Sequence, residues 1–282
     1  MRELSVRQIE DAVCELFQTA NRKLPCDLAA RIADAAQAET EALPRAVMED
    51  IAANLTAADE MHVPICQDTG MAVLFCDLGP DVHLVGGDFT EAVNRGVARA
   101  YRDGYLRCSV VADPIRRGNT GDNTPAVIHL RLVPGDRVKL TAAPKGFGSE
   151  NMCALRMFTP SATVDEIEDF IVSSVRSAGG NPCPPVVLGV GIGGDFEQCA
   201  VLPNARCAVP FPSGTPTRST GIWRTGSSKN ATRSASDPKA SAAKRQRCPW
   251  RSKRRRRISP DCPLRSTSAV TSRVTRKPFC EL

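Results

Sequence analysis

Apolar residues recur at helical spacing through the first sixty positions of the chain. Ile9, Val13, Leu16 and Ala20 fall on one face of a helix. Residues 27–42 and 43–58 continue with the same type of spacing. The pattern therefore predicts a helical N-terminal region over residues 5–60.

After residue 70 the pattern changes to short apolar runs between turn residues. Residues 72–78 predict a buried strand, 82–85 predict a second strand, and 89–105 predict a helix. Residues 126–133 alternate apolar and polar positions, and a Pro-Gly-Asp turn leads from them to the apolar run 138–142. This arrangement predicts that the last two segments pair as a β-hairpin.

The next elements carry clear start and stop signals. Thr163 and Glu166 form a capping-box pattern ahead of a helical apolar face, and two glycines from Gly179 end it. Residues 185–189 predict a buried strand and 195–202 the start of another helix. Together the elements predict an α+β fold, a helical N-terminal region followed by a mixed β-sheet with packed helices.

At about Leu202 the composition changes. Of the 37 Lys and Arg residues, 19 lie in 203–282, with only 3 of the 31 Asp and Glu, so residues 1–202 carry 18 basic and 28 acidic side chains. The basic segment has almost no apolar periodicity, which predicts an irregular, disordered tail. Its run Arg251–Arg257 is also typical of nucleic-acid contacts or nuclear localisation.

Cysteine content is high, at twelve residues, eight of them in 1–202. The N-terminus has no apolar segment typical of a signal peptide, and no run of about 18 apolar residues predicts a membrane span. We therefore expect a cytoplasmic protein with reduced thiols, some of them metal ligands, and no membrane contact.

Two cysteines stand in segments that suit a metal site. Cys66 is followed by Gln67, Asp68, Thr69 and Gly70, so a potential thiolate ligand lies beside polar groups that could hold a substrate. Cys183 is flanked by prolines, which would stiffen its loop. Both segments are equally compatible with buried cysteines in ordinary turns.

Three further motifs could bind anions or cofactors. Gly189–Gly194 fits the dinucleotide fingerprint GxGxxG, which would indicate an NAD-dependent oxidoreductase, although no βαβ unit follows it. Residues 145–152 form a glycine loop that could bind an anion or simply join a strand to a helix. Arg107 could hold a carboxylate with two hydrogen bonds, or be solvated.

Four long motifs in this order resemble one family. They are PICQDTGMAV, YLRCSVVADPIRRGNTGDNTPAVIH, APKGFGSENM and NPCPPVVLGVGIGGDFE, all within residues 1–202. They are similar to the alpha subunit of class I (iron–sulfur) fumarate hydratase and of the related L(+)-tartrate dehydratase. The resemblance implies a hydro-lyase that acts on a small dicarboxylate, works with a beta subunit and does not bind nucleic acid.

The same resemblance implies roles for individual residues. Cys66 and Cys183 would be two of three ligands of a [4Fe–4S] cluster, whose open iron acts as a Lewis acid. Catalytic roles fall to Asp68 and Arg107, and Arg107 would bind a substrate carboxylate. Asp68 and Arg107 would bind substrate together with Gln67 and Gly148.

The resemblance stops where the composition changes. In the family a helix, glycine-rich and histidine segments and a segment with the third cysteine follow, and none of them is present. In a shifted reading frame, however, residues 234–244 permit GIGPQGFGGK, and other family-like segments are permitted in the family's order. We therefore interpret 1–202 as a truncated catalytic domain and 203–282 as a frameshift product, which predicts an inactive or unstable chain; the alternative is a natural basic tail.

Overall fold

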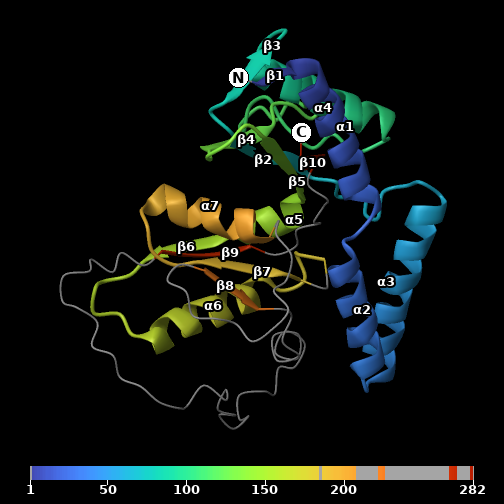
Figure 1. Cartoon of the computed structure of the whole chain (residues 1–282). Coiled ribbons are helices and arrows are strands. Elements are labelled where there is room, and N and C mark those ends of the chain that lie inside the picture. The colour runs from blue at the N-terminus through green and yellow to red at the C-terminus, as the bar shows by residue number, and fades with distance from the viewer. Residues whose placement is uncertain (1, 184–185, 208–221, 226–266, 272–279, 282) are drawn as a thin grey trace.

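The computed structural model describes residues 2–183, 186–207, 222–225, 267–271 and 280–281 (Figure 1). The elements, in chain order, are β1 (Arg2–Ser5), α1 (Val6–Arg22), α2 (Cys26–Ala38), α3 (Ala42–Glu60), β2 (Met71–Leu78), β3 (Val82–Val85), α4 (Phe89–Asp103), β4 (Val127–Leu132), β5 (Val138–Lys145), α5 (Phe147–Glu150), β6 (Ala154–Met157), α6 (Val164–Ala178), β7 (Leu188–Gly191), α7 (Phe196–Cys207), β8 (Ile222–Thr225), β9 (Thr267–Thr271) and β10 (Cys280–Glu281). The predicted α+β class, with a helical N-terminal region and mixed sheets, is confirmed.

Helix α1 begins at a complete capping box. The Ser5 side chain accepts a backbone N–H of the first turn, and the Gln8 side chain accepts the Ser5 N–H at 3.2 Å. Its predicted apolar face is buried, with Ile9, Val13 and Ala20 fully inaccessible to solvent, and the neighbouring Phe17 is fully inaccessible as well. This face packs on α4 and on β5, so α1 closes one side of the main core.

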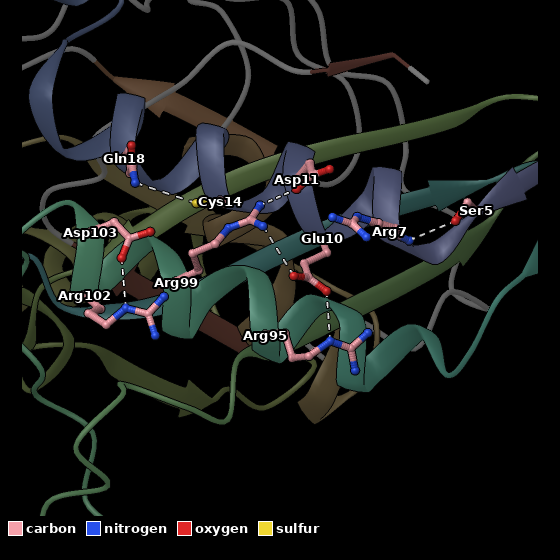
Figure 2. Close-up of polar contacts among 10 residues, drawn as sticks. All are labelled: Ser5, Arg7, Glu10, Asp11, Cys14, Gln18, Arg95, Arg99, Arg102 and Asp103. Carbon is pink, nitrogen blue, oxygen red and sulfur yellow. Dashed lines mark hydrogen bonds and ion pairs between the residues drawn. The ribbon is translucent and has the colours of Figure 1, made fainter.

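Charged residues surround the contact between α1 and α4. Glu10 accepts hydrogen bonds from Arg95 at 2.8 Å and Arg99 at 3.4 Å (Figure 2). Gly96 faces the backbone of α1, and a Cβ added there would be 2.6 Å from the Glu10 carbonyl oxygen. The two helices therefore approach more closely than a larger residue at position 96 would permit.

The predicted hairpin is wrong. Strand β2 lies between β4 and β5, so the two strands predicted to pair do not contact each other as neighbours. β2 pairs parallel with β4 and antiparallel with β5, and its Leu74 and Cys76 are fully buried. Because β2 is apolar on both faces, the central position buries more apolar surface than an edge position would.

Helices α2 and α3 form an antiparallel pair that extends from the rest of the molecule (Figure 1). Within this pair only Ile32, Ala36 and Ala58 are buried. Leu43 and Val47, on α3, are exposed. No helix in the described part of the chain is both long and apolar enough for a membrane span.

A second sheet has the order β6-β9-β7-β8, with α6 and α7 on its two sides (Figure 1). The predicted capping box of α6 is present, since Thr163 and Glu166 exchange both hydrogen bonds. The strand predicted over 185–189 is instead β7, slightly later in the chain. Most of the predicted irregular tail, 203–282, including Arg251–Arg257, lies outside the described residues.

The glycine motif at Gly189–Gly194 joins β7 to α7, as a dinucleotide fingerprint would. Both neighbouring strands, β8 and β9, run antiparallel to β7. A dinucleotide-binding unit requires a parallel crossover at this point. The topology around β7 therefore differs from that of an NAD-binding fold.

Candidate active site

A cavity of about 640 Å³ lies where three loops meet. These are the loop before β2, the loop after α4 and the loop that leads into α5. The lining residues are Asp68, Arg107, Cys108, Ser109, Val111, Pro114, Arg117, Asn119, Phe147, Gly148 and Asn151. Its size suits a small-molecule ligand, and three of the predicted site residues, Asp68, Arg107 and Gly148, share it.

Asp68 faces the glycine loop that follows β5. The Gly148 N–H donates to Asp68 Oδ2 at 3.3 Å, and a Cβ added at Gly146 would be 2.8 Å from the same oxygen. A Cβ at Gly148 would be 2.7 Å from the Asn181 carbonyl oxygen. Glycine is required at position 148 because the neighbouring backbone leaves no room for a Cβ, whereas a side chain at position 146 would displace the Asp68 carboxylate. Gly148 lies between the Asp68 segment and the loop that leads to Cys183.

The backbone of Arg107 is held by Thr69, the residue after Asp68. The Arg107 N–H donates to Thr69 Oγ1 at 3.0 Å, and the same hydroxyl donates to the Arg107 carbonyl at 3.1 Å. The Tyr101 hydroxyl donates to the carbonyls of Thr69 and Gly70, both at 3.0 Å. Burial raises the pKa of Tyr101, so this hydroxyl keeps its proton at neutral pH.

Lys145 closes the glycine loop from inside the protein. Its side chain is almost completely buried, and Nζ donates to Ser149 Oγ at 2.7 Å and pairs with Glu150 Oε2 at 3.0 Å. The Ser149 hydroxyl in turn donates to the Gly146 carbonyl at 2.9 Å. The loop 145–152 is thus a strand-to-helix connection whose backbone N–H contacts the protein's own Asp68.

Sequence reasoning missed Cys108 as a residue of the cavity. Its thiol donates to the Gly121 carbonyl at 3.5 Å. Burial, and to a smaller extent the charge of Asp122, raise the pKa of Cys108, so the thiol is protonated at neutral pH. The signal that could have found it is its position directly after Arg107 in the same motif.

The predicted cluster ligands do not line the cavity. Cys66 is partly buried, Cys183 and Gln67 are exposed, and none of the three is among the lining residues of the cavity. Both cysteines are outside any disulfide. In the described part of the chain no three His, Cys, Asp or Glu side chains gather where they could hold a metal ion.

Comparison with known proteins gives consistent matches over the region that carries this cavity. The family model described as fumarate hydratase (fumerase) matches residues 10–221, which continues past Leu202. A protein of Methanocaldococcus jannaschii, provisionally named L(+)-tartrate dehydratase subunit alpha, is 35% identical over 200 residues, 69% of this chain and 70% of that relative.

Two relatives come from Escherichia coli. The L(+)-tartrate dehydratase subunit alpha of strain UTI89 / UPEC is 26% identical over 216 residues, 76% of this chain and 70% of the relative. The anaerobic class I fumarate hydratase of strain K12 is 38% identical over 139 residues, 48% of this chain but only 25% of that enzyme. This chain therefore matches most of the tartrate dehydratase alpha subunits and a quarter of the fumarate hydratase.

Proposed function

Since this chain belongs to the fumarate hydratase family, we propose that it is the alpha subunit of a hydro-lyase. The reaction would be the reversible hydration of fumarate to malate, or the dehydration of tartrate. The observation that carries the proposal is the cavity that Asp68, Arg107 and Gly148 share. Its lining combines a guanidinium with a carboxylate, which suits a small dicarboxylate with a hydroxyl.

Arg107 would bind one carboxylate of the substrate through two parallel hydrogen bonds. Asp68 Oδ2 already accepts the Gly148 N–H, so Oδ1 would contact the substrate hydroxyl and exchange a proton with it. Gly148 would let the ligand approach the backbone closely, and Gln67 would contact the substrate from the neighbouring position. Arg107 and Asp68 are the proposed catalytic residues.

Cys66 and Cys183 are the proposed ligands of a [4Fe–4S] cluster, which would supply a Lewis acid when bound. The described residues lack a third ligand beside them. We propose that the third cysteine belonged to the sequence that the frameshift after Leu202 replaced. The chain as written would then be unable to hold a complete cluster and would be inactive.

A beta subunit would complete the enzyme, because two relatives that match this chain are named as alpha subunits. Reduced cysteines are typical of the cytoplasm, where we propose that the protein resides. No observation on the described residues favours nucleic-acid or NAD binding. These alternatives would require salt-sensitive DNA binding that needs residues 203–282, or nicotinamide binding at Gly189–Gly194.

The experiment compares two forms of the chain, each co-expressed with a beta subunit of the family. One is the 282-residue chain, and the other has its reading frame restored after Leu202. We expect only the restored form to bind a [4Fe–4S] cluster, read from its visible absorption, and to hydrate fumarate or dehydrate tartrate. Cluster binding and turnover by the unrestored chain would contradict the frameshift proposal. A restored chain that binds a full cluster and is still inactive on both substrates would contradict the hydro-lyase proposal.

A further inference from the structure

Asn123 is fully buried in the loop between α4 and β4, and it is not among the residues that line the cavity. Its Oδ1 accepts the backbone N–H groups of Ser109 at 2.7 Å and of Val110 at 3.0 Å. Its Nδ2 donates to the carbonyl of Gly70 at 3.0 Å. One side chain therefore bonds the segment after Arg107 to the segment after Asp68.

The two segments are joined at a second point by Thr69, whose hydroxyl bonds both backbone groups of Arg107. Thr69 fixes the position of Arg107 itself, and Asn123 fixes the next turn of the loop at Ser109 and Val110. With two attachment points, the loop can neither slide nor rotate relative to the Asp68 segment. A single attachment at Thr69 would leave rotation about that point free.

The residue type at this position follows from two requirements. The backbone of Asn123 has φ +62°, a conformation that asparagine tolerates better than most non-glycine residues. The site also needs one acceptor for two N–H groups and one donor for a carbonyl, and the side-chain amide supplies both. Neither serine nor leucine at position 123 would satisfy these groups.

We propose that Asn123 is the positioning residue that sets Arg107 relative to Asp68 for dicarboxylate binding. The proposal rests on the function proposed above for this cavity. Asn123 touches neither the cavity nor a ligand in it, so it acts through the two backbone segments that it joins. A misplacement of the guanidinium by a fraction of an ångström would weaken a bidentate contact before it disturbed the fold.

The test uses the full chain and succinate as the probe ligand. Asn123→Gly removes the side chain without straining the backbone, and we expect it to weaken succinate binding at least fivefold in calorimetry. The matched control is Asn94→Ala, which removes another side-chain amide that holds the same loop, at the Ala126 N–H (2.9 Å), on the side of α4. The control should change succinate affinity less than twofold.

A positioning role predicts that the effect of Asn123→Gly depends on Arg107, which a purely structural role does not predict. In an Arg107→Gln background, Asn123→Gly should no longer weaken the remaining succinate binding. Equal weakening in both backgrounds, or unchanged affinity of Asn123→Gly in the native background, would overturn the proposal.

Hydrogen exchange provides a readout that needs no ligand. We expect the Ser109 and Val110 amides to be protected in the native chain, exposed in Asn123→Gly, and protected again in Asn123→Asp, which keeps an acceptor oxygen. Fast exchange of both amides in the native chain would overturn the proposal even if every variant failed to fold. If the frame-restored chain with its beta subunit does not bind succinate, the dicarboxylate function fails, while the exchange comparison in the native chain still shows whether Asn123 joins the two segments.

Discussion

The two sheet regions of this molecule differ in how much of their surface they bury. Around β2 and β5, with α1 and α4, many apolar side chains are completely inaccessible to solvent, among them Phe17, Leu74 and Val97. Around β6 and β7, the described apolar residues are mostly part-exposed, and Val172 on α6 is 53% exposed. The first region has a complete core of its own, and the second has an apolar surface that its described residues do not cover.

The candidate site includes residues from both regions. Asp68 and Arg107 lie beside the well-packed region, where the Thr69 hydroxyl bonds the Arg107 backbone and the buried Tyr101 hydroxyl bonds the Thr69 carbonyl. Cys183 lies after α6, in the less buried region, and is exposed. The comparison teaches that the proposed substrate-contacting side of the site is built from residues 1–151, whereas the proposed cluster side would require sequence beyond the second region.

The largest expected effect is on the core of the first region. Phe17→Ala should lower the free energy of unfolding by about 3–5 kcal/mol, because it leaves a cavity in a closely packed core. Val172→Ala, in the second region, should change it by less than about 0.5 kcal/mol, since the side chain is already half in water. Urea titration, monitored by hydrogen exchange of the β2 and β5 amides, measures the free energy of unfolding of both variants. Similar losses of unfolding free energy in the two variants would contradict the contrast between the regions.

The next effect concerns the buried cation beneath the glycine loop. Lys145→Met leaves Glu150 and Ser149 without their partner and should cost roughly 2–3 kcal/mol of unfolding free energy. Lys23→Met is the matched control, because the pair of Lys23 with Asp59 is exposed on both sides, and it should cost less than about 0.5 kcal/mol. Equal midpoints of thermal unfolding for the two variants would refute this ranking.

A smaller change is expected in ligand binding. Arg107→Gln removes the proposed carboxylate contact and should weaken succinate binding roughly tenfold to a hundredfold, the range for a charge-assisted hydrogen-bond pair. Arg116→Gln removes the same charge from an exposed position outside the lining of the cavity. Calorimetry should therefore show a much larger loss of succinate affinity in Arg107→Gln than in Arg116→Gln. A similar loss in both variants would mean that succinate responds only to the overall positive charge.

The smallest effect is kinetic and depends on pH. Because burial raises the pKa of Cys108, its thiol should react with iodoacetamide several-fold more slowly in the folded chain than in urea at pH 8–9. As the pH rises, the unfolded thiol ionises first, so the ratio of the two rates should begin to narrow above the unfolded pKa and level off above the folded pKa. Peptide mapping by mass spectrometry gives the rate at Cys108, and equal rates at pH 8 would count against a protected thiol.

Local patterns predicted most of the helices and strands because they depend on neighbours in the sequence. The spacing of Ile9 and Val13 and the capping box at Thr163 each specify a helix without reference to distant residues. The hairpin prediction failed because alternation in 126–133 reveals a strand but not its partner. The more apolar β2 occupies the position between the two predicted partners.

The site was predictable to a similar extent. The motifs indicated Asp68, Arg107 and Gly148, and these lie around one cavity, while their roles remain predictions. Cys108 could have been selected only by its position directly after Arg107. Asn123 could not be selected from the sequence, because its importance comes from its contact with Gly70, which lies 53 positions away. Burial of a polar side chain is decided by tertiary packing, which periodicity does not report.

The arrangement of β2 and β5 has a consequence for how the chain is made. Every residue that lines the cavity precedes Leu202 by 51 positions or more, since the last of them is Asn151. A ribosome that adds 5–20 residues per second needs roughly 3–10 seconds to cover that distance. Under the frameshift proposed above, the nascent chain would have time to close the β2–β5 pair and assemble the cavity before the first altered codon is translated. The proposed loss of the cluster would then leave the cavity itself formed.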